Sequence, residues 1–175
     1  MRAPLRRPAS VLPQTTQRLM SLPPAPFARA GYWQPMSEES TTPDLVELQN
    51  ALTEAGGRRD LDAITAFYAP GVIWDMSPMG MGVFEGRAAV RGFLEDWFAA
   101  YEKYEFEAEG ILDFGNGVGL RMLIQKGRPV GSSGEVQLRY AAVSVWEDGK
   151  IVRITNYNDI DEARAAAERL AAERG

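Results

Sequence analysis

The polar residues best placed for binding or catalysis lie in and beside two apolar runs near the C-terminal end of the sequence. Tyr140, Ser144 and Asn156 occupy even-numbered positions in the runs 137–146 and 150–158. A phenol, a hydroxyl and a carboxamide can orient a ligand oxygen by hydrogen bonds without transferring a proton. Asp75 is the one carboxylate inside an apolar run, and burial there would raise its pKa toward the range of acid–base catalysis. These residue types predict a binding site with one candidate base.

Asp75 also has a structural interpretation. Side chains alternate between the two faces of a strand, so Asp75 points away from the face that Trp74 and Met76 share. A carboxylate in that position can bond a neighbouring backbone group or an arginine. Both interpretations stay open at the level of the sequence.

Histidine and cysteine are absent from the sequence. Their absence excludes Ser-His-Asp and Cys-His catalysis, a histidine base, histidine-ligated zinc and disulfides. We therefore expect neither a metal nor a cofactor.

The two apolar runs are separated by Glu147-Asp148-Gly149-Lys150, a sequence typical of a hairpin turn. Such a turn fixes the register of its strands, and the even-numbered residues of both strands then share one face. That face is apolar with isolated polar groups, the composition of a core or of a ligand cavity.

The elements that must position this hairpin are predicted from apolar periodicity and capping residues. Thr42 and Pro43 open a helix that ends at Gly56-Gly57, and Asp60 caps a second helix that reaches Tyr68. Strands are predicted over 72–76, 104–109 and 118–126, with a polar loop over 127–134. A long amphipathic helix carries the stripe Val90, Phe93, Leu94, Trp97, Phe98 and Tyr101, and Asp159 caps a closing helix to Arg174. This order of elements predicts an α+β domain.

The totals describe one ordinary domain. The chain has 175 residues, 45% of them hydrophobic, and no apolar run long enough to cross a bilayer. Five arginines and no acid fall in residues 1–35, so the remainder holds 14 basic and 24 acidic side chains, a net charge of −10. An acidic domain argues against nucleic-acid and membrane partners. The cytoplasm is the default location for a chain without cysteine.

Seven prolines and no periodic pattern occur in residues 1–35. We expect a disordered extension over residues 1–38, followed by a domain over 39–175. A secretory signal cleaved near Ala28-Arg29-Ala30 and a natural start at Met36 are two alternatives.

Five short motifs occur in the order of one known superfamily: Phe67-Tyr68-Ala69-Pro70, Val72-Ile73-Trp74-Asp75, Phe84-Glu85-Gly86-Arg87, Trp146-Glu147-Asp148-Gly149-Lys150-Ile151 and Asn156-Tyr157-Asn158-Asp159. Together they resemble the SnoaL-like branch of the nuclear transport factor 2-like (NTF2-like) superfamily over about residues 43–170. The resemblance implies a cone in which a curved, mostly antiparallel sheet wraps around N-terminal helices, with a C-terminal helix. It also implies an internal cavity and, commonly, a homodimer. Members include polyketide cyclases, ketosteroid isomerase, limonene-epoxide hydrolase and scytalone dehydratase.

The catalytic positions of those enzymes hold other residue types here. Aligned on Gly117-Val118 and on Gly149-Lys150-Ile151, the arginine and the first aspartate of the epoxide hydrolases fall on Met122 and Ile124, and their second aspartate falls on Asn156. The base of ketosteroid isomerase falls on Met76 and its proton-sharing acid on Ala142. No catalytic residue can therefore be assigned, and enzyme activity stays an open question.

The sequence predicts a pocket that binds a small, largely apolar molecule carrying a hydroxyl or carbonyl group. One alternative is an isomerase, cyclase or hydrolase acting on a small cyclic hydrophobic substrate, and another is a partner-binding module with a filled cavity. An interior void of several hundred Å³ would favour a ligand. The residues expected to line the pocket are Trp74, Met76, Trp97, Met122, Ile124, Tyr140, Ala142, Ser144, Ile154 and Asn156.

Overall fold

A computed structural model describes residues 44–175. The predicted extension over residues 1–38 and the predicted helix cap at Thr42-Pro43 lie outside the described residues. The helix that follows begins at Leu45, and Asp44 is its cap because the Asp44 carboxylate accepts from the Val46 N–H at 3.3 Å.

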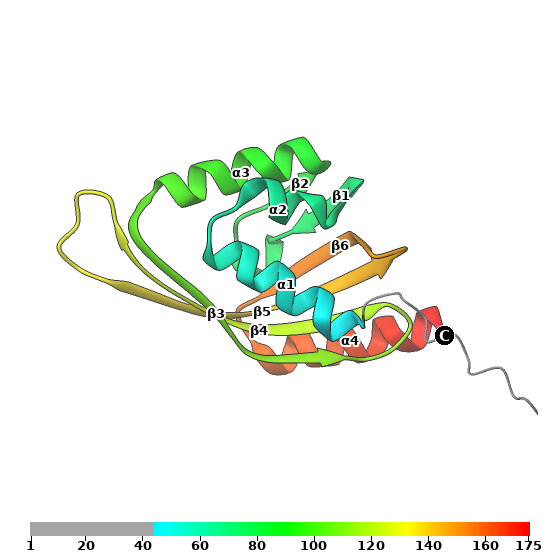
Figure 1. Ribbon diagram of the computed structural model, residues 1–175. Coiled ribbons are helices and arrows are strands. Elements are labelled where there is room, and N and C mark those ends of the chain that lie inside the picture. The colour runs from blue at the N-terminus through cyan, green and yellow to red at the C-terminus, as the bar shows by residue number, and fades with distance from the viewer. Residues whose placement is uncertain (1–43) are drawn as a thin grey trace, which may run out of the picture. The chain divides into compact units, whose positions relative to one another are not determined.

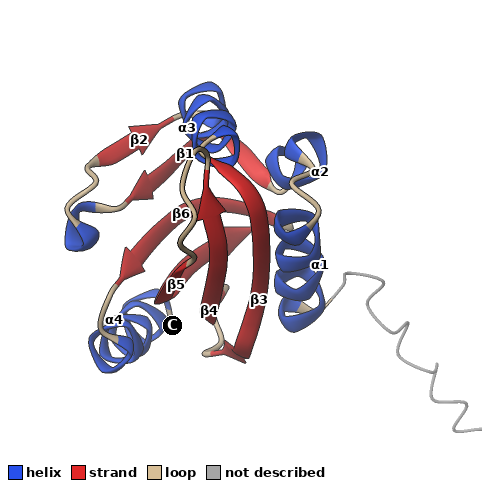
Figure 2. Cartoon of the chain, turned by 90° about the vertical axis from the view of Figure 1, so that its left-hand side faces the viewer, coloured by secondary structure: helices blue, strands red, loops and turns tan. Residues whose placement is uncertain are grey.

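The described residues form four α-helices, one short 3-10 helix and a single six-stranded sheet. The strands lie in the order β2-β1-β6-β5-β4-β3, and only β1 and β6 run parallel. The sheet curves around α1, α2 and α3 (Figures 1 and 2), as expected for an NTF2-like α+β cone. The elements are α1 Leu45–Gly57, α2 Leu61–Ala66, β1 Tyr68–Asp75, η1 Ser77–Met79, β2 Val83–Glu85, α3 Arg87–Ala99, β3 Tyr101–Asp113, β4 Val118–Pro129, β5 Val136–Glu147, β6 Lys150–Tyr157 and α4 Ile160–Arg174.

The hairpin of β5 and β6 is confirmed. Its turn residues Asp148 and Gly149 have φ values of 49° and 72°. Two consecutive positive φ values suit the right-handed twist of a tight hairpin, which explains the Asp-Gly pair. In the resulting register Ser144 lies opposite Ile154, and Ala142 lies opposite Asn156.

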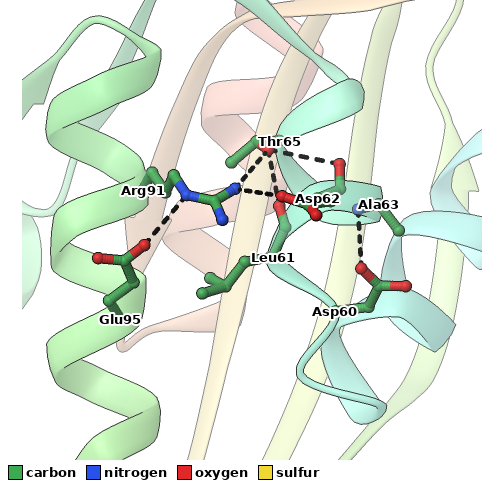
Figure 3. Close-up of polar contacts among 7 residues, drawn as sticks. All are labelled: Asp60, Leu61, Asp62, Ala63, Thr65, Arg91 and Glu95. Carbon is green, nitrogen blue, oxygen red and sulfur yellow. Dashed lines mark hydrogen bonds and ion pairs between the residues drawn. The ribbon is translucent and has the colours of Figure 1, made fainter.

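Helices α2 and α3 are joined by polar contacts around Arg91 (Figure 3). The Arg91 guanidinium donates to Asp62 on α2 at 2.8 Å and to Glu95 one turn further along α3 at 3.0 Å. It also donates to the Thr65 hydroxyl at 3.4 Å. Asp60 caps α2 as predicted, because its carboxylate accepts from the Ala63 N–H at 3.0 Å. These contacts hold α2 against α3 at the side of the helical layer.

The closing helix α4 covers the opposite face of the sheet. Asp159 caps it as predicted, accepting from the N–H groups of Asp161 and Glu162. Its buried alanines pack on the outward-facing side chains of β4 and β5, and Figure 1 shows α4 on the far side of these strands from α1. Both faces of the central strands are therefore apolar. The cluster consists of Val118, Leu120, Ala141, Val143, Ala163, Ala167 and Ala171.

Several predicted boundaries are wrong. Helix α3 ends at Ala99, so Tyr101 of the predicted helical stripe begins β3, which runs to Asp113 and not over 104–109; β1 begins four residues before its predicted start at 72. The second helix ends at Ala66, and Tyr68 is the first residue of β1. The backbone here pairs with β6, since the Ile151 N–H donates to the Phe67 carbonyl at 2.8 Å and Tyr68 lies opposite Ile151. Arg87 of α3 also donates to the Tyr68 carbonyl. Strand pairing thus overrides the helical periodicity around Phe67 and Tyr68. Strand β4 also runs to Pro129, three residues beyond its predicted end.

Among residues 44–175, no helix is long and apolar enough to span a membrane.

Candidate functional site

A cavity lies between the concave face of the sheet and helices α1, α2 and α3. It encloses about 690 Å³ when counted up to its open mouth. The interior is narrow, because the centre of a water-sized sphere can move through only about 70 Å³. This space is several times that needed for one water molecule.

Strand register decides which side chains form the floor of the cavity. Directly opposed residues share a face, and the pairs Leu123 with Tyr140 and Arg121 with Ala142 both point inward. Asn156 on the neighbouring strand β6 lies opposite Ala142, so the floor continues across β4, β5 and β6.

Seven of the predicted pocket residues line this one cavity. Six of them come from β1, α3, β5 and β6, and Met76 directly follows β1; cross-strand pairing and α3 bring them together. They are Trp74, Met76, Trp97, Tyr140, Ala142, Ile154 and Asn156.

Met122 and Ile124 do not line the cavity. The floor positions on β4 belong to Arg121, Leu123 and Gln125, which alternate with those two residues. The alignment was thus wrong by one residue on this strand, and a shift of one residue moves every side chain to the other face.

Ser144 is also absent from the lining, although it is fully buried. It lies next to Ala142 on the inward side of β5, closer to the hairpin turn. Its hydroxyl accepts from the Trp146 indole N–H at 2.8 Å and donates to the Gly119 carbonyl at 3.4 Å. Ser144 therefore serves the packing of Trp146.

An aromatic wall closes the side of the cavity formed by α3. Phe93 stacks on Trp97 with ring centroids 5.8 Å apart and meets Trp74 edge-on at 5.5 Å. Three methionines, Met76, Met79 and Met81, complete the lining at the loop between β1 and β2. Thioether side chains are flexible, so this part of the lining can adapt to a guest.

Gln125 anchors the aromatic end of the cavity. Its side-chain oxygen accepts from the Trp97 indole N–H at 3.0 Å and from the Tyr104 hydroxyl at 3.5 Å. Burial raises the pKa of Tyr104 well above its usual range, so its phenol remains a donor. The acceptor oxygen of Gln125 is thus already engaged.

Three other polar groups of the lining have no hydrogen-bond partner among the described residues: the indole N–H of Trp74, Nε of Arg121 and the side-chain oxygen of Asn156. All three residues are at least nine-tenths buried. An unpartnered buried polar group costs about 1–3 kcal/mol, so a guest that bonds these groups would be favoured. Tyr140 makes no hydrogen bond to Asn156, so the two do not satisfy each other.

Arg121 is the charged residue of the lining. Only 5% of its surface is exposed, and Nη1 donates to the Thr53 hydroxyl at 3.4 Å. Burial lowers the pKa of Arg121, and the neighbouring phenols of Tyr68 and Tyr140 oppose that change. Burial also raises the pKa of Tyr68 to about 12, against the opposing effect of Arg121. At neutral pH the cation therefore faces two protonated phenols.

Asp75 lies outside the cavity lining. Its carboxylate accepts from the Ser77 N–H and from Arg153, each at 3.0 Å. These contacts, with the Ser77 bond first, hold the pKa of Asp75 below its usual value. Asp75 is thus ionised and engaged with neighbouring groups.

No carboxylate contributes to the lining from residues 44–175. The same residues contain no group of three or more acidic side chains arranged to hold a metal ion. The cavity offers apolar surface, hydrogen-bond donors, the acceptor oxygen of Asn156 and one cation.

Sequence reasoning missed Tyr68, Arg121 and Gln125. A signal for the last two was present, because Arg121 and Gln125 are polar interruptions of an apolar strand at positions i and i+4. The even-numbered residues of β4 are more hydrophobic and looked more suitable for an interior. Helix α4 covers the even-numbered face, so that face is apolar although it points away from the cavity. A prediction based on hydrophobicity therefore assigned the wrong face of β4 to the interior.

Comparison with known proteins agrees with this architecture. The family model of the SnoaL-like domain matches residues 49–154. No curated protein sequence gave a significant match.

Three solved structures illustrate the fold. TerC, co-crystallised with polyporic acid, has 18% identity and a TM-score of 0.57, and the alignment covers 71% of this chain and 98% of TerC. A protein of ketosteroid isomerase-like fold from Catenulispora acidiphila, in complex with trimethylamine, has 14% identity and a TM-score of 0.58, covering 69% and 92%. A protein from Xanthomonas campestris, proposed to be a polyketide cyclase, has 26% identity and a TM-score of 0.54, covering 70% and 96%. The matched family model and the shared cone show that this chain belongs to the SnoaL-like domain family of the NTF2-like superfamily.

Proposed function

We propose that this domain binds a small, largely apolar organic molecule that carries at least one hydrogen-bond acceptor. The observation that carries the proposal is the set of unpartnered polar groups in an apolar cavity. The Trp74 indole N–H, Arg121 Nε and the Asn156 oxygen are buried and lack partners among the described residues. An acceptor on the guest would satisfy the two N–H donors, and a donor on the guest would satisfy the Asn156 oxygen. Either bond would remove a desolvation cost that the free protein bears.

The dimensions of the cavity limit the guest. The volume of about 690 Å³ includes open solvent at the mouth. The enclosed core of about 70 Å³ is below the several hundred Å³ typical of a site for a drug-sized ligand, so the guest must be small or the lining must move. A flat ring fits such a narrow space better than a bulky polycyclic molecule. The stacked Phe93 and Trp97 rings offer a surface for a flat guest. The methionines of the lining can rotate to enlarge the space.

The structural relatives support this reading only at the level of the fold. Two of them were crystallised with small organic molecules, polyporic acid and trimethylamine. Fold alone does not carry function, so the proposal depends on the residues of this cavity.

Cinnamamide is a suitable neutral probe, because it combines a flat ring with a carbonyl acceptor. Saturation-transfer NMR should show contact between its ring and the protein, and calorimetry should give saturable binding. Native mass spectrometry of protein isolated from its own cells should in addition show a bound small molecule. If cinnamamide and cinnamate both fail to bind and no molecule co-purifies, the proposal is wrong, and a packed interaction module becomes the better account.

A further inference from the structure

The free edge of Arg121 is the most distinctive feature of the cavity. Nη1 points to Thr53, whereas Nε has no partner and Nη2 makes no hydrogen bond to any described residue. Nε and Nη2 form one side of the planar guanidinium fork, the side that pairs with both oxygens of a carboxylate. This edge belongs to a residue that lines the cavity.

Arg121 also lacks a counter-ion within residues 44–175. In the ion pairs of these residues the arginine and lysine side chains are 33–54% exposed and the carboxylate side chains are 20–88% exposed. None of these pairs includes Arg121. A buried charge is normally paired, because removing an ion from water costs several kcal/mol. The fold therefore retains a costly cation on the wall of its cavity.

Most other polar groups of the lining near Arg121 are donors. The Trp74 indole N–H on the same lining has no partner, and the phenols of Tyr68 and Tyr140 are close enough to the guanidinium to raise its pKa. Both phenols stay protonated at neutral pH because burial raises the pKa of each, that of Tyr68 to about 12. A donor-rich group of side chains around a cation matches a ligand that brings acceptors and a negative charge.

We propose that the ligand is a small cyclic or aromatic carboxylic acid whose carboxylate pairs with the Nε and Nη2 edge of Arg121. This inference rests on the proposed function and specifies its ligand class. The apolar body of the acid lies against the aromatic wall of Phe93 and Trp97. The carboxylate supplies the counter-ion that Arg121 lacks in the described part of the chain.

The test compares cinnamate with cinnamamide, two probes of nearly equal shape that differ in charge. Calorimetry at neutral pH should show that the wild-type protein binds cinnamate at least tenfold more tightly than cinnamamide. The Arg121→Met variant should bind both with similar affinity, because it should lose at least tenfold more affinity for cinnamate than for cinnamamide. Arg121→Lys, which keeps the charge and loses the fork, should show an intermediate preference.

The Arg139→Met variant is the matched control. It removes one positive charge from the outer side of β5, where Arg139 pairs with Glu109. The preference for cinnamate should persist in this variant, because the net charge alone does not create it.

The outcomes separate the two proposals. A wild-type protein that binds both probes equally contradicts the carboxylate assignment and leaves the cavity as a neutral binding site. A wild-type protein that binds neither probe, and with which no small molecule co-purifies, contradicts the proposed function itself. Persistence of the preference in Arg121→Met would overturn the role of Arg121, and the wild-type comparison decides the ligand class even if that variant does not fold.

Discussion

The guanidinium of Arg121 on β4 donates to the hydroxyl of Thr53 on α1 at 3.4 Å. Thr53 in turn donates to the carbonyl of Gln49 one turn earlier in the helix at 2.8 Å. This contact links the floor of the cavity to the helix that packs over β3 and β4. It occupies Nη1 of the guanidinium, whereas Nε and Nη2 make no hydrogen bond to the described residues.

Thr53→Val should lower the free energy of unfolding by about 1–3 kcal/mol, because it removes an acceptor from a buried cation. Urea denaturation measures the change. In the Arg121→Met background the same substitution should lower the free energy of unfolding by markedly less, since no cation is left unpaired. Equal losses in the two backgrounds would show that the Thr53 contact has no energetic importance.

Thr65→Val provides the matched control for Thr53→Val. Thr65 on α2 makes the same helical bond, to the Leu61 carbonyl, and accepts from Arg91 at 3.4 Å. The Arg91 side chain is 38% exposed and is also paired with Asp62 and Glu95. This substitution should therefore lower the free energy of unfolding by less than Thr53→Val does, by no more than about 1 kcal/mol relative to the wild type.

Leu123→Trp and Met122→Trp test the face assignment of β4. Leu123 lines the cavity and Met122 does not, although the two are adjacent in the chain. Leu123→Trp should fill the cavity and weaken cinnamamide binding at least tenfold, whereas Met122→Trp should change it by no more than about twofold. Circular dichroism checks that both variants fold. If only Met122→Trp lost binding, the even-numbered residues of β4, and not the odd-numbered ones, would form the cavity floor.

Asp75→Asn tests the structural role of Asp75. Because the folded pKa is lowered, chiefly by the Ser77 N–H, this carboxylate stabilises the fold above its unfolded pKa of about 4. That stabilisation is lost as the pH falls through the lowered folded value. The variant should be less stable by about 1 kcal/mol at pH 7, and the difference should disappear in acid. An unchanged urea midpoint combined with lost ligand affinity would place Asp75 at the functional site.

Gly117→Ala should be much more destabilising than Gly115→Ala. Both glycines have positive φ, 75° and 81° respectively, so each alanine incurs about 1–2 kcal/mol of backbone strain. A Cβ at Gly117 would also collide with the Trp146 carbonyl, while the space around Gly115 is open within 4 Å. The extra cost at Gly117 should be about 2 kcal/mol or more in thermal or urea unfolding. Equal costs would show that the turn before β4 can move away from Trp146.

The parts of the fold that could be predicted from the sequence are those determined by local chemistry. Asp148-Gly149 sets its hairpin through backbone preferences, and Asp60 and Asp159 cap their helices through neighbouring N–H groups. The face of β4 depends instead on a distant element. Helix α4 buries Val118 and Leu120 from outside, so both sides of the strand are apolar and alternation alone cannot distinguish them.

The dependence on distant elements also explains why only some residues of the cavity lining could be predicted. Tyr140 and Asn156 were placed correctly on the lining, because the hairpin turn determines the register of β5 and β6. Arg121 could not be placed, because its position depends on pairing across β4 and on the cover of the outer face. Tyr68 was assigned to a helix, and its place beside Arg121 follows from pairing between β1 and β6.

The most direct test of the account is a crystal structure of the protein with 4-bromocinnamate, in which anomalous scattering locates the bromine. We predict one bromine peak at the aromatic wall near Phe93 and Trp97, with the carboxylate about 3 Å from Nε and Nη2 of Arg121. A molecule bound outside the cavity, or one inside it with the carboxylate turned away from Arg121, would contradict the account.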